Sequence, residues 1–169
     1  MGAPAAAANS PERRLATFIR KFSTADQRII RAVRRALRHR FPTANELVYD
    51  NYNFFVIGYS PTERPSDAII SIAARANGVG LCFIHGARLP DPGKMLLGSG
   101  RQTRFIRLES PQVLERPEVE ALVAAAVSQA SVPFRTAGRG KLIIRSVSAK
   151  QRPRRTLPRG PKTARASRG

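Results

Sequence analysis

The sequence feature that most restricts the fold is the dipeptide Asn77-Gly78, which stands between two short apolar runs. Asn-Gly is a strong signal for a two-residue hairpin turn, because both residues tolerate a positive φ angle. The runs 68–73 and 79–84 are therefore predicted to form neighbouring antiparallel strands. Further β-rich segments at 52–59 and 104–108 extend the prediction to a mainly antiparallel sheet of four strands.

Helix signals flank this sheet region on both sides. Residues 10–12 combine an N-cap Ser, a Pro at the first helical position and an acid in the first turn. Ser23, with Asp26 three residues later, resembles a capping box and predicts a second helix, which ends before Pro42. A last helix is predicted at about 117–130. Helices before and after a run of strands indicate the α+β class.

The chain of 169 residues is expected to hold one domain with shorter segments around it. We expect residues 1–9 to be a disordered lead-in and residues 10–132 to be the α+β domain. Residues 133–147 are interpreted as a linker with a possible short edge strand. Residues 148–169 are rich in Pro, Gly, Arg and Lys, so a disordered basic tail is predicted there.

Cys82 is the one cysteine of the sequence, so no internal disulfide is possible. It stands in an apolar run and is interpreted as a buried strand thiol rather than a nucleophile, which would need a polar pocket and a base. No apolar run approaches the roughly 20 residues of a membrane-spanning helix. We therefore expect a cytoplasmic protein without a membrane partner.

The net charge of +19 is distributed unevenly along the sequence. Residues 12–41 carry 10 basic and 2 acidic side chains, and residues 141–169 carry 10 basic and none acidic. Residues 42–140 are nearly balanced, with 10 basic and 9 acidic side chains. Such concentrated positive charge attracts polyanions, including nucleic acid, but carries no information about sequence specificity.

The second helix carries Arg28, Arg31, Arg34, Arg35 and Arg38 on the side opposite its apolar stripe. Two interpretations stay open for this face: a solvated outer surface, or a ridge that binds polyanions. The tail has the same two interpretations, and it has no aromatic residue to stack on bases, so reading of a base sequence is not expected. The candidates for polyanion binding are Arg28, Arg31, Arg35, Arg38, Lys150, Arg152, Arg154 and Arg155.

Four stretches of the sequence, in this order and spacing, carry a resemblance to a known family. They are Phe41–Tyr52, with a Pro-x-Ala-x-Glu segment and following tyrosines, and then Val79–Phe83, Gly86–Pro92 and Leu96–Ile106. Together they resemble the YdhG-like family, which is classed as a domain of unknown function. The resemblance covers about residues 15–130, most of the predicted domain.

This resemblance implies a frataxin-like domain, in which helices pack on one face of a twisted, mainly antiparallel sheet. One member of the family is regarded as an iron chaperone, and frataxin-type iron binding relies on an acidic ridge on the first helix and the adjoining strand. Here the matching helix carries arginines, which repel the hard cations that prefer carboxylate oxygens. We therefore expect no metal site and no cofactor, and iron handling is a disfavoured alternative.

Acids and phenols cluster just after the second helix, at Glu46, Tyr49, Asp50 and Tyr52. If this segment is helical, Glu46 and Asp50 lie one turn apart and form a small polar site for a cation or an amine, which Asp91 joins if its loop folds back. The alternative is a network of hydrogen bonds at the helix end, with the tyrosines packed on the sheet edge. In that case Asp91, which lies between two prolines, caps backbone N–H groups.

A glycine-rich stretch at 98–101, with Arg101 and the nearby Arg104, has the composition of an anion cradle. It lacks the Lys-Ser/Thr end of a P-loop, and a tight turn into a strand is the alternative. No Ser-His-Asp or Cys-His order stands out. The leading expectation is a non-enzymatic binding domain of unknown ligand, with non-specific binding of nucleic acid as the alternative.

Overall fold

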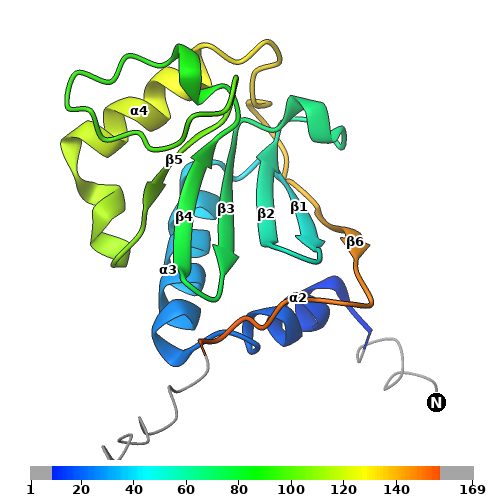
Figure 1. Ribbon diagram of the computed structural model, residues 1–169. Helices are drawn as coiled ribbons and strands as arrows, with labels where there is room; N and C mark the ends of the chain where they lie inside the picture. Colours follow the sequence, from blue (N-terminus) through cyan, green and yellow to red (C-terminus); the bar gives the residue numbers. More distant parts are fainter. Residues whose placement is uncertain (1–8, 157–169) are drawn as a thin grey trace, which may run out of the picture.

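The computed structural model describes residues 9–156 (Figure 1). Residues 1–8 of the predicted lead-in and residues 157–169 of the predicted tail lie outside the described residues. Within 9–156 the chain forms three α-helices, α2 (Pro11–Ile19), α3 (Thr24–Arg40) and α4 (Pro117–Ser128). Three short 3-10 helices connect larger elements: η1 (Pro65–Asp67), η2 (Gly86–Arg88) and η3 (Pro111–Glu115).

The strands form one sheet of mixed but mostly antiparallel pairing, which confirms the α+β class. Its order is β5-β4-β3-β2-β1-β6, and β1–β6 is the parallel pair. The strands are β1 (Asn45–Asp50), β2 (Phe55–Ser60), β3 (Ile70–Arg75), β4 (Gly78–Phe83), β5 (Arg104–Arg107) and β6 (Leu142–Val147). The possible edge strand predicted in 133–147 is therefore present as β6.

The two N-terminal helices begin where the capping signals predict. The Ser10 side chain accepts a hydrogen bond from the Arg13 N–H at 3.4 Å, and the Ser23 side chain accepts one from the Asp26 N–H at 3.2 Å. These bonds satisfy donors that the first turn of a helix otherwise leaves unpaired. The apolar stripe of α3 is buried, with its members at Ile29, Ile30, Val33 and Leu37.

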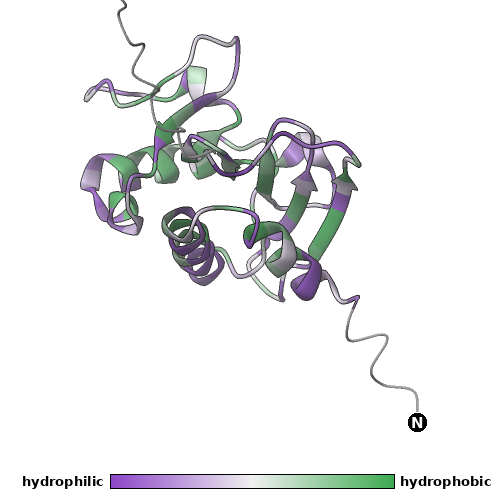
Figure 2. Cartoon of the chain, turned by 60° about the horizontal axis from the view of Figure 1, so that its bottom comes forward, coloured by the Kyte–Doolittle hydropathy of each residue, from purple (hydrophilic) through white to green (hydrophobic). Residues whose placement is uncertain are grey.

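The core lies between the sheet and α3, which crosses behind the strands in Figure 1. One row of paired side chains shows how the register builds it: Val48, Ile57, Ile72, Leu81 and Ile106. All five are buried. Figure 2 shows the strands largely in the hydrophobic colour, and the helix turns in both colours, as expected for helices with one buried face. No helix in the described part of the chain is long and apolar enough to cross a membrane.

The β3–β4 hairpin differs from the prediction by one position. Arg75 pairs with Gly78, so the two connecting residues are Ala76 and Asn77 rather than Asn77 and Gly78. Gly78 is the first residue of β4 and has a φ angle of 134°, a conformation that favours glycine. The hairpin itself is confirmed.

The segment that contains Glu46 and Asp50 is a strand, not the end of a helix. Its sequence, Asn-Glu-Leu-Val-Tyr-Asp, lacks a simple alternation because both of its faces are mostly buried. Its carboxylates are buried beside cationic side chains of other elements, which the local sequence does not reveal. The strand predicted at 52–59 correspondingly begins later, at Phe55.

Residues 148–156 were expected to open a disordered tail, but they run along the domain. The Ser148 N–H donates to the Asp50 carbonyl, and the Arg152 N–H donates to the Tyr52 carbonyl, both at 2.9 Å. Arg154 is buried. Arg154 pairs with the buried Asp50 carboxylate, which would otherwise lack this cation. This ion pair attaches the segment to the domain.

Candidate functional site

Glu46 lies on the helix-facing side of β1 and belongs to a network of ion pairs. Arg34 of α3 donates from Nε to its Oε2 and from Nη2 to its Oε1, each at 2.9 Å, and the Tyr59 hydroxyl donates to Oε2 at 3.1 Å. The same guanidinium donates to both carboxylate oxygens of Glu12, at 2.8 and 3.0 Å. Arg34 was expected on the outer face of its helix, but its contacts with Glu46 and Glu12 turn it toward the sheet, so it ties α2, α3 and β1 together.

This environment alters the acidity of the groups around Arg34. Burial, with the Glu46 carboxylate nearby, raises the pKa of Tyr59 well above its ordinary value, so Tyr59 acts as a donor. The hydrogen bond from Arg34 lowers the pKa of Glu12 although partial burial opposes it. Both oxygens of Glu46 are already occupied by donors, and the network is structural in character.

Asp50 occupies the other end of β1 and has its own partners. Lys21 Nζ lies 2.6 Å from Oδ2 and Arg154 Nη2 lies 2.9 Å from Oδ1. Burial favours the neutral form of Asp50, but hydrogen bonds from Lys21, Gln151 and Arg154 outweigh it and lower its pKa. Within the described residues, Arg154 Nε and Nη1 have no hydrogen-bond partner.

The structure does not bring the predicted polar residues into one site. Glu46 and Asp50 face the same side of β1 but belong to separate ion-pair networks. Tyr49 faces the other side of the sheet, and the exposed Tyr52 ring lies under the Arg152 guanidinium at 5.6 Å. Asp91 accepts hydrogen bonds from the N–H groups of residues 95 and 96, both at 2.9 Å, as the capping interpretation predicts.

The glycine-rich stretch has the contacts of a turn. Arg104 donates to the carbonyls of Gly100 and Thr103, so its guanidinium is directed at backbone oxygens. Gly98 has a φ angle of 107°, which a turn into a strand requires here. Arg101 is exposed. This arrangement agrees with the tight-turn interpretation.

The arginine stripe is the set Arg28, Arg31 and Arg35 on the outer side of α3. All three are exposed and form no ion pair with any described residue, although Arg31 donates to Gln27 at 3.1 Å. Arg38 continues the stripe but lies 3.5 Å from Glu12 and 3.6 Å from Glu46. At 100° per residue the stripe lies opposite the buried side of α3, so it faces solvent.

The four predicted tail cations do not share one role. Arg154 is buried against Asp50, and Arg155 donates to the backbone carbonyls of residues 20, 21 and 22. Lys150 and Arg152 are exposed. Two of the four thus hold the segment on the domain, and two remain available at its surface.

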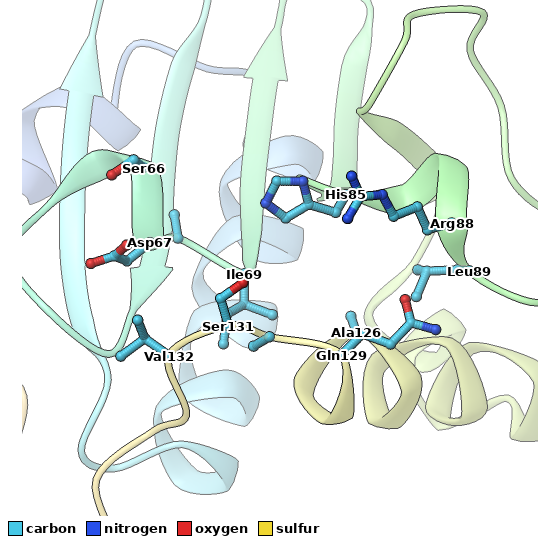
Figure 3. Close-up of a pocket in the computed structure, with 12 residues that line it drawn as sticks. Ser66, Asp67, Ile69, His85, Arg88, Leu89, Ala126, Gln129, Ser131 and Val132 are labelled. Atoms are coloured by element: carbon cyan, nitrogen blue, oxygen red, sulfur yellow. The ribbon is translucent and has the colours of Figure 1, made fainter.

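A cavity of about 400 Å³ lies between η1, η2 and the end of α4. Figure 3 shows Asp67 on one side and His85 and Arg88 on the other, with Ile69 between them and Leu89 beside Arg88. No motif in the sequence marks these residues. Chain folding alone brings them together, because more than one loop contributes. The size and mixed lining are those of a small-molecule site.

Comparison with known proteins gives no assignment: no family model matches the chain, and neither a curated protein nor a solved structure matches it. Across residues 9–156, no three His, Cys, Asp or Glu side chains gather in an arrangement that would hold a metal ion.

Proposed function

We propose that this protein binds nucleic acid without sequence specificity, through the arginine stripe of α3 together with cations of the C-terminal segment. The observation that carries the proposal is that Arg28, Arg31 and Arg35 stand side by side without a carboxylate partner among the described residues. Three acids near the N-terminal helices are already paired: Glu12 and Glu46 with Arg34, and Asp50 with Lys21 and Arg154. The stripe therefore keeps its charge for an external anion.

The dimensions of the stripe suit a phosphate backbone. From Arg28 to Arg35 the helix rises about 10 Å, at roughly 1.5 Å per residue. One strand of duplex DNA carries a phosphate about every 3.4 Å, so the stripe spans about three phosphates. Neutralising phosphates releases bound counterions, and this release supplies most of the affinity in non-specific binding.

Cations beyond the stripe support the same function. Lys150 and Arg152 are exposed, and the sequence adds four more cations after Thr156. A deletion from Lys141 onward is the wrong test of these charges, because it also removes β6 and the Arg154 partner of Asp50. A chain that ends after Thr156 loses the four cations but keeps β6 and Arg154.

We also propose that the fold is of the YdhG-like, frataxin-like type, as the sequence resemblance implies; this part of the proposal concerns the architecture alone. The predicted ligand site at Glu46, Asp50 and Asp91 is not part of the proposed function, because the oxygens of these carboxylates accept hydrogen bonds from this chain's own groups. Iron handling also stays disfavoured, since the outer side of α3 is cationic.

The test is fluorescence anisotropy with a labelled duplex at low salt. The triple variant Arg28→Gln, Arg31→Gln, Arg35→Gln is expected to bind about tenfold more weakly or worse, because about three phosphate contacts are lost. The matched control replaces Arg64, Arg139 and Arg145 by Gln, which removes the same charge from exposed positions elsewhere. Equal losses in the two variants would show that net charge, not the stripe, determines binding; no binding by the wild type would refute the function.

A further inference from the structure

The sheet has a second face, on the side away from α3, that carries two adjoining hollows. Side chains alternate along a strand, so Ala73, Cys82 and Phe105 point away from the core row formed by their neighbours. Figure 1 views the sheet from this side, with α3 behind it. One hollow measures about 690 Å³ and the other about 180 Å³, and both are lined by Phe54, Ala73 and Cys82.

Small residues form the floor of these hollows, and aromatic residues stand at their rim. Ala73, Gly80 and Cys82 are small, so a flat ring can approach the sheet closely. Phe54 and Tyr52 stand at the rim with 39% and 47% of their surface exposed. Phe54 lines both hollows, so its partly exposed ring lies where the two meet.

The charge around the hollows has a single sign. Among the described residues that line them, Arg75 and Arg107 are charged and none is Asp or Glu. The Arg75 guanidinium lies 5.3 Å from the centre of the Phe54 ring, and that of Arg152 lies 5.6 Å from the centre of the Tyr52 ring. Amides and a hydroxyl that can hydrogen-bond to base edges also line them: Asn51, Asn53, Asn77 and Thr103.

We propose that this face binds single-stranded nucleic acid, with unpaired bases stacked on Phe54 and Tyr52 and phosphates held by Arg75, Arg107 and Arg152. Exposed aromatic rings beside cations on an open surface are the combination that single-strand binders use, because every base has a flat face. A duplex keeps its bases stacked inside and cannot use the rings. The proposal deepens the proposed function and rests on it: the stripe on the outer side of α3 binds nucleic acid of either kind, and this opposite face adds a site for unpaired strands.

The test compares labelled oligo-dT of about 12 nucleotides with a duplex of the same length, by anisotropy on the full-length protein. The double variant Tyr52→Ala, Phe54→Ala is expected to bind oligo-dT about tenfold more weakly or worse, since stacking on each ring is lost. Its affinity for the duplex is expected to stay within about twofold, because phosphate contacts dominate there. Val132→Ala, at an exposed apolar residue of the Figure 3 cavity, is the control and should change neither.

Cys82 offers a second readout that does not depend on affinity. It is the one cysteine of the chain and lies on the floor of both hollows. Saturating oligo-dT is expected to slow its modification by N-ethylmaleimide, whereas saturating duplex is expected to leave the rate unchanged. The thiol thereby reports whether the bound strand covers this face.

The outcomes separate the two proposals. Suppose that the wild type binds both nucleic acids, that the Tyr52→Ala, Phe54→Ala variant keeps the wild-type affinity for oligo-dT, and that oligo-dT does not slow Cys82 modification. In that case the sheet face is not the single-strand site, and the proposed function stands. If the wild type binds neither, both proposals fail. If neither nucleic acid protects Cys82 but an apolar peptide does, this face is a protein-binding surface and the proposal is overturned.

Discussion

Two carboxylates on the same side of β1 are held by partners from different parts of the chain. Glu46 is reached from α3 by Arg34, which lies 12 residues before it in the sequence. Asp50 is reached by Lys21 and by Arg154, and the latter is 104 residues away. Burial penalises each charge, and only complete pairing makes such groups tolerable in the core. Both residues therefore fix the positions of other elements rather than offering oxygens to a ligand.

At the residue scale we predict that Asp50→Asn destabilises the protein by about 3–5 kcal/mol near neutral pH, because a buried guanidinium loses its anion. The matched control is Glu63→Gln, which breaks an exposed pair with Lys141 and should change the stability little. The measurement is the free energy of unfolding from urea titrations. A loss in Asp50→Asn no larger than in the control would contradict the account.

The lowered pKa of Asp50 also predicts a pH dependence. In the unfolded chain this carboxyl titrates near its ordinary value of about 4. Its contribution is therefore complete above that pH and is lost as the pH falls through the lower pKa of the folded state. Wild-type stability should fall in this acid range more steeply than that of Asp50→Asn, and parallel curves would show that Asp50 is not the group responsible.

At the scale of elements, how well the sequence predicts a segment depends on how local its partners are. The helices α2 and α3 follow from caps and apolar spacing, both of which act within a few residues. β1 was not predicted, because Glu46 and Asp50 look like surface residues until Arg34, Lys21 and Arg154 are placed beside them. The attachment of 148–156 has the same cause, since its apolar content is low and an ion pair holds it.

How well the sequence predicts a candidate site also depends on how local its residues are. Helical spacing predicted the exposed positions of Arg28, Arg31 and Arg35, but it also put Arg34 and Arg38 on this face, and both lie beside Glu12 and Glu46. The sheet face was not predicted, because Phe54, Ala73 and Cys82 meet only through the register of β2, β3 and β4. No sequence pattern specifies that register, and the hairpin prediction itself was shifted by one position.

We predict that residues 148–156 stabilise the domain. A chain that ends after Val147 should be less stable than a chain that ends after Thr156 by about 3 kcal/mol or more, because Asp50 loses its Arg154 partner and several hydrogen bonds disappear. The chain ending after Thr156 is the control, as it keeps all of these contacts. Urea unfolding of the two truncated chains decides the question, and equal midpoints would mean that the segment does not stabilise the domain.

At the scale of the whole molecule, some charged side chains form ion pairs that hold the fold together, and others lie exposed. Most carboxylates near the N-terminal helices neutralise cations that hold the fold together, such as Arg34, Lys21 and Arg154. Part of the excess that gives the net charge of +19 lies exposed on the arginine stripe and at Lys150 and Arg152, and the sequence adds four more cations after Thr156. A surface of this kind attracts a polyanion over a distance set by the ionic strength.

The measurement that tests this account most directly is the salt dependence of duplex binding by the wild type and by the triple variant Arg28→Gln, Arg31→Gln, Arg35→Gln. Each lost phosphate contact reduces the slope of log K against log salt by about 0.9, so the variant's slope should be smaller in magnitude by about 2.7. The Arg64, Arg139, Arg145 control should keep the wild-type slope. If the triple variant keeps it as well, the arginine stripe does not contact phosphates and the central claim is wrong.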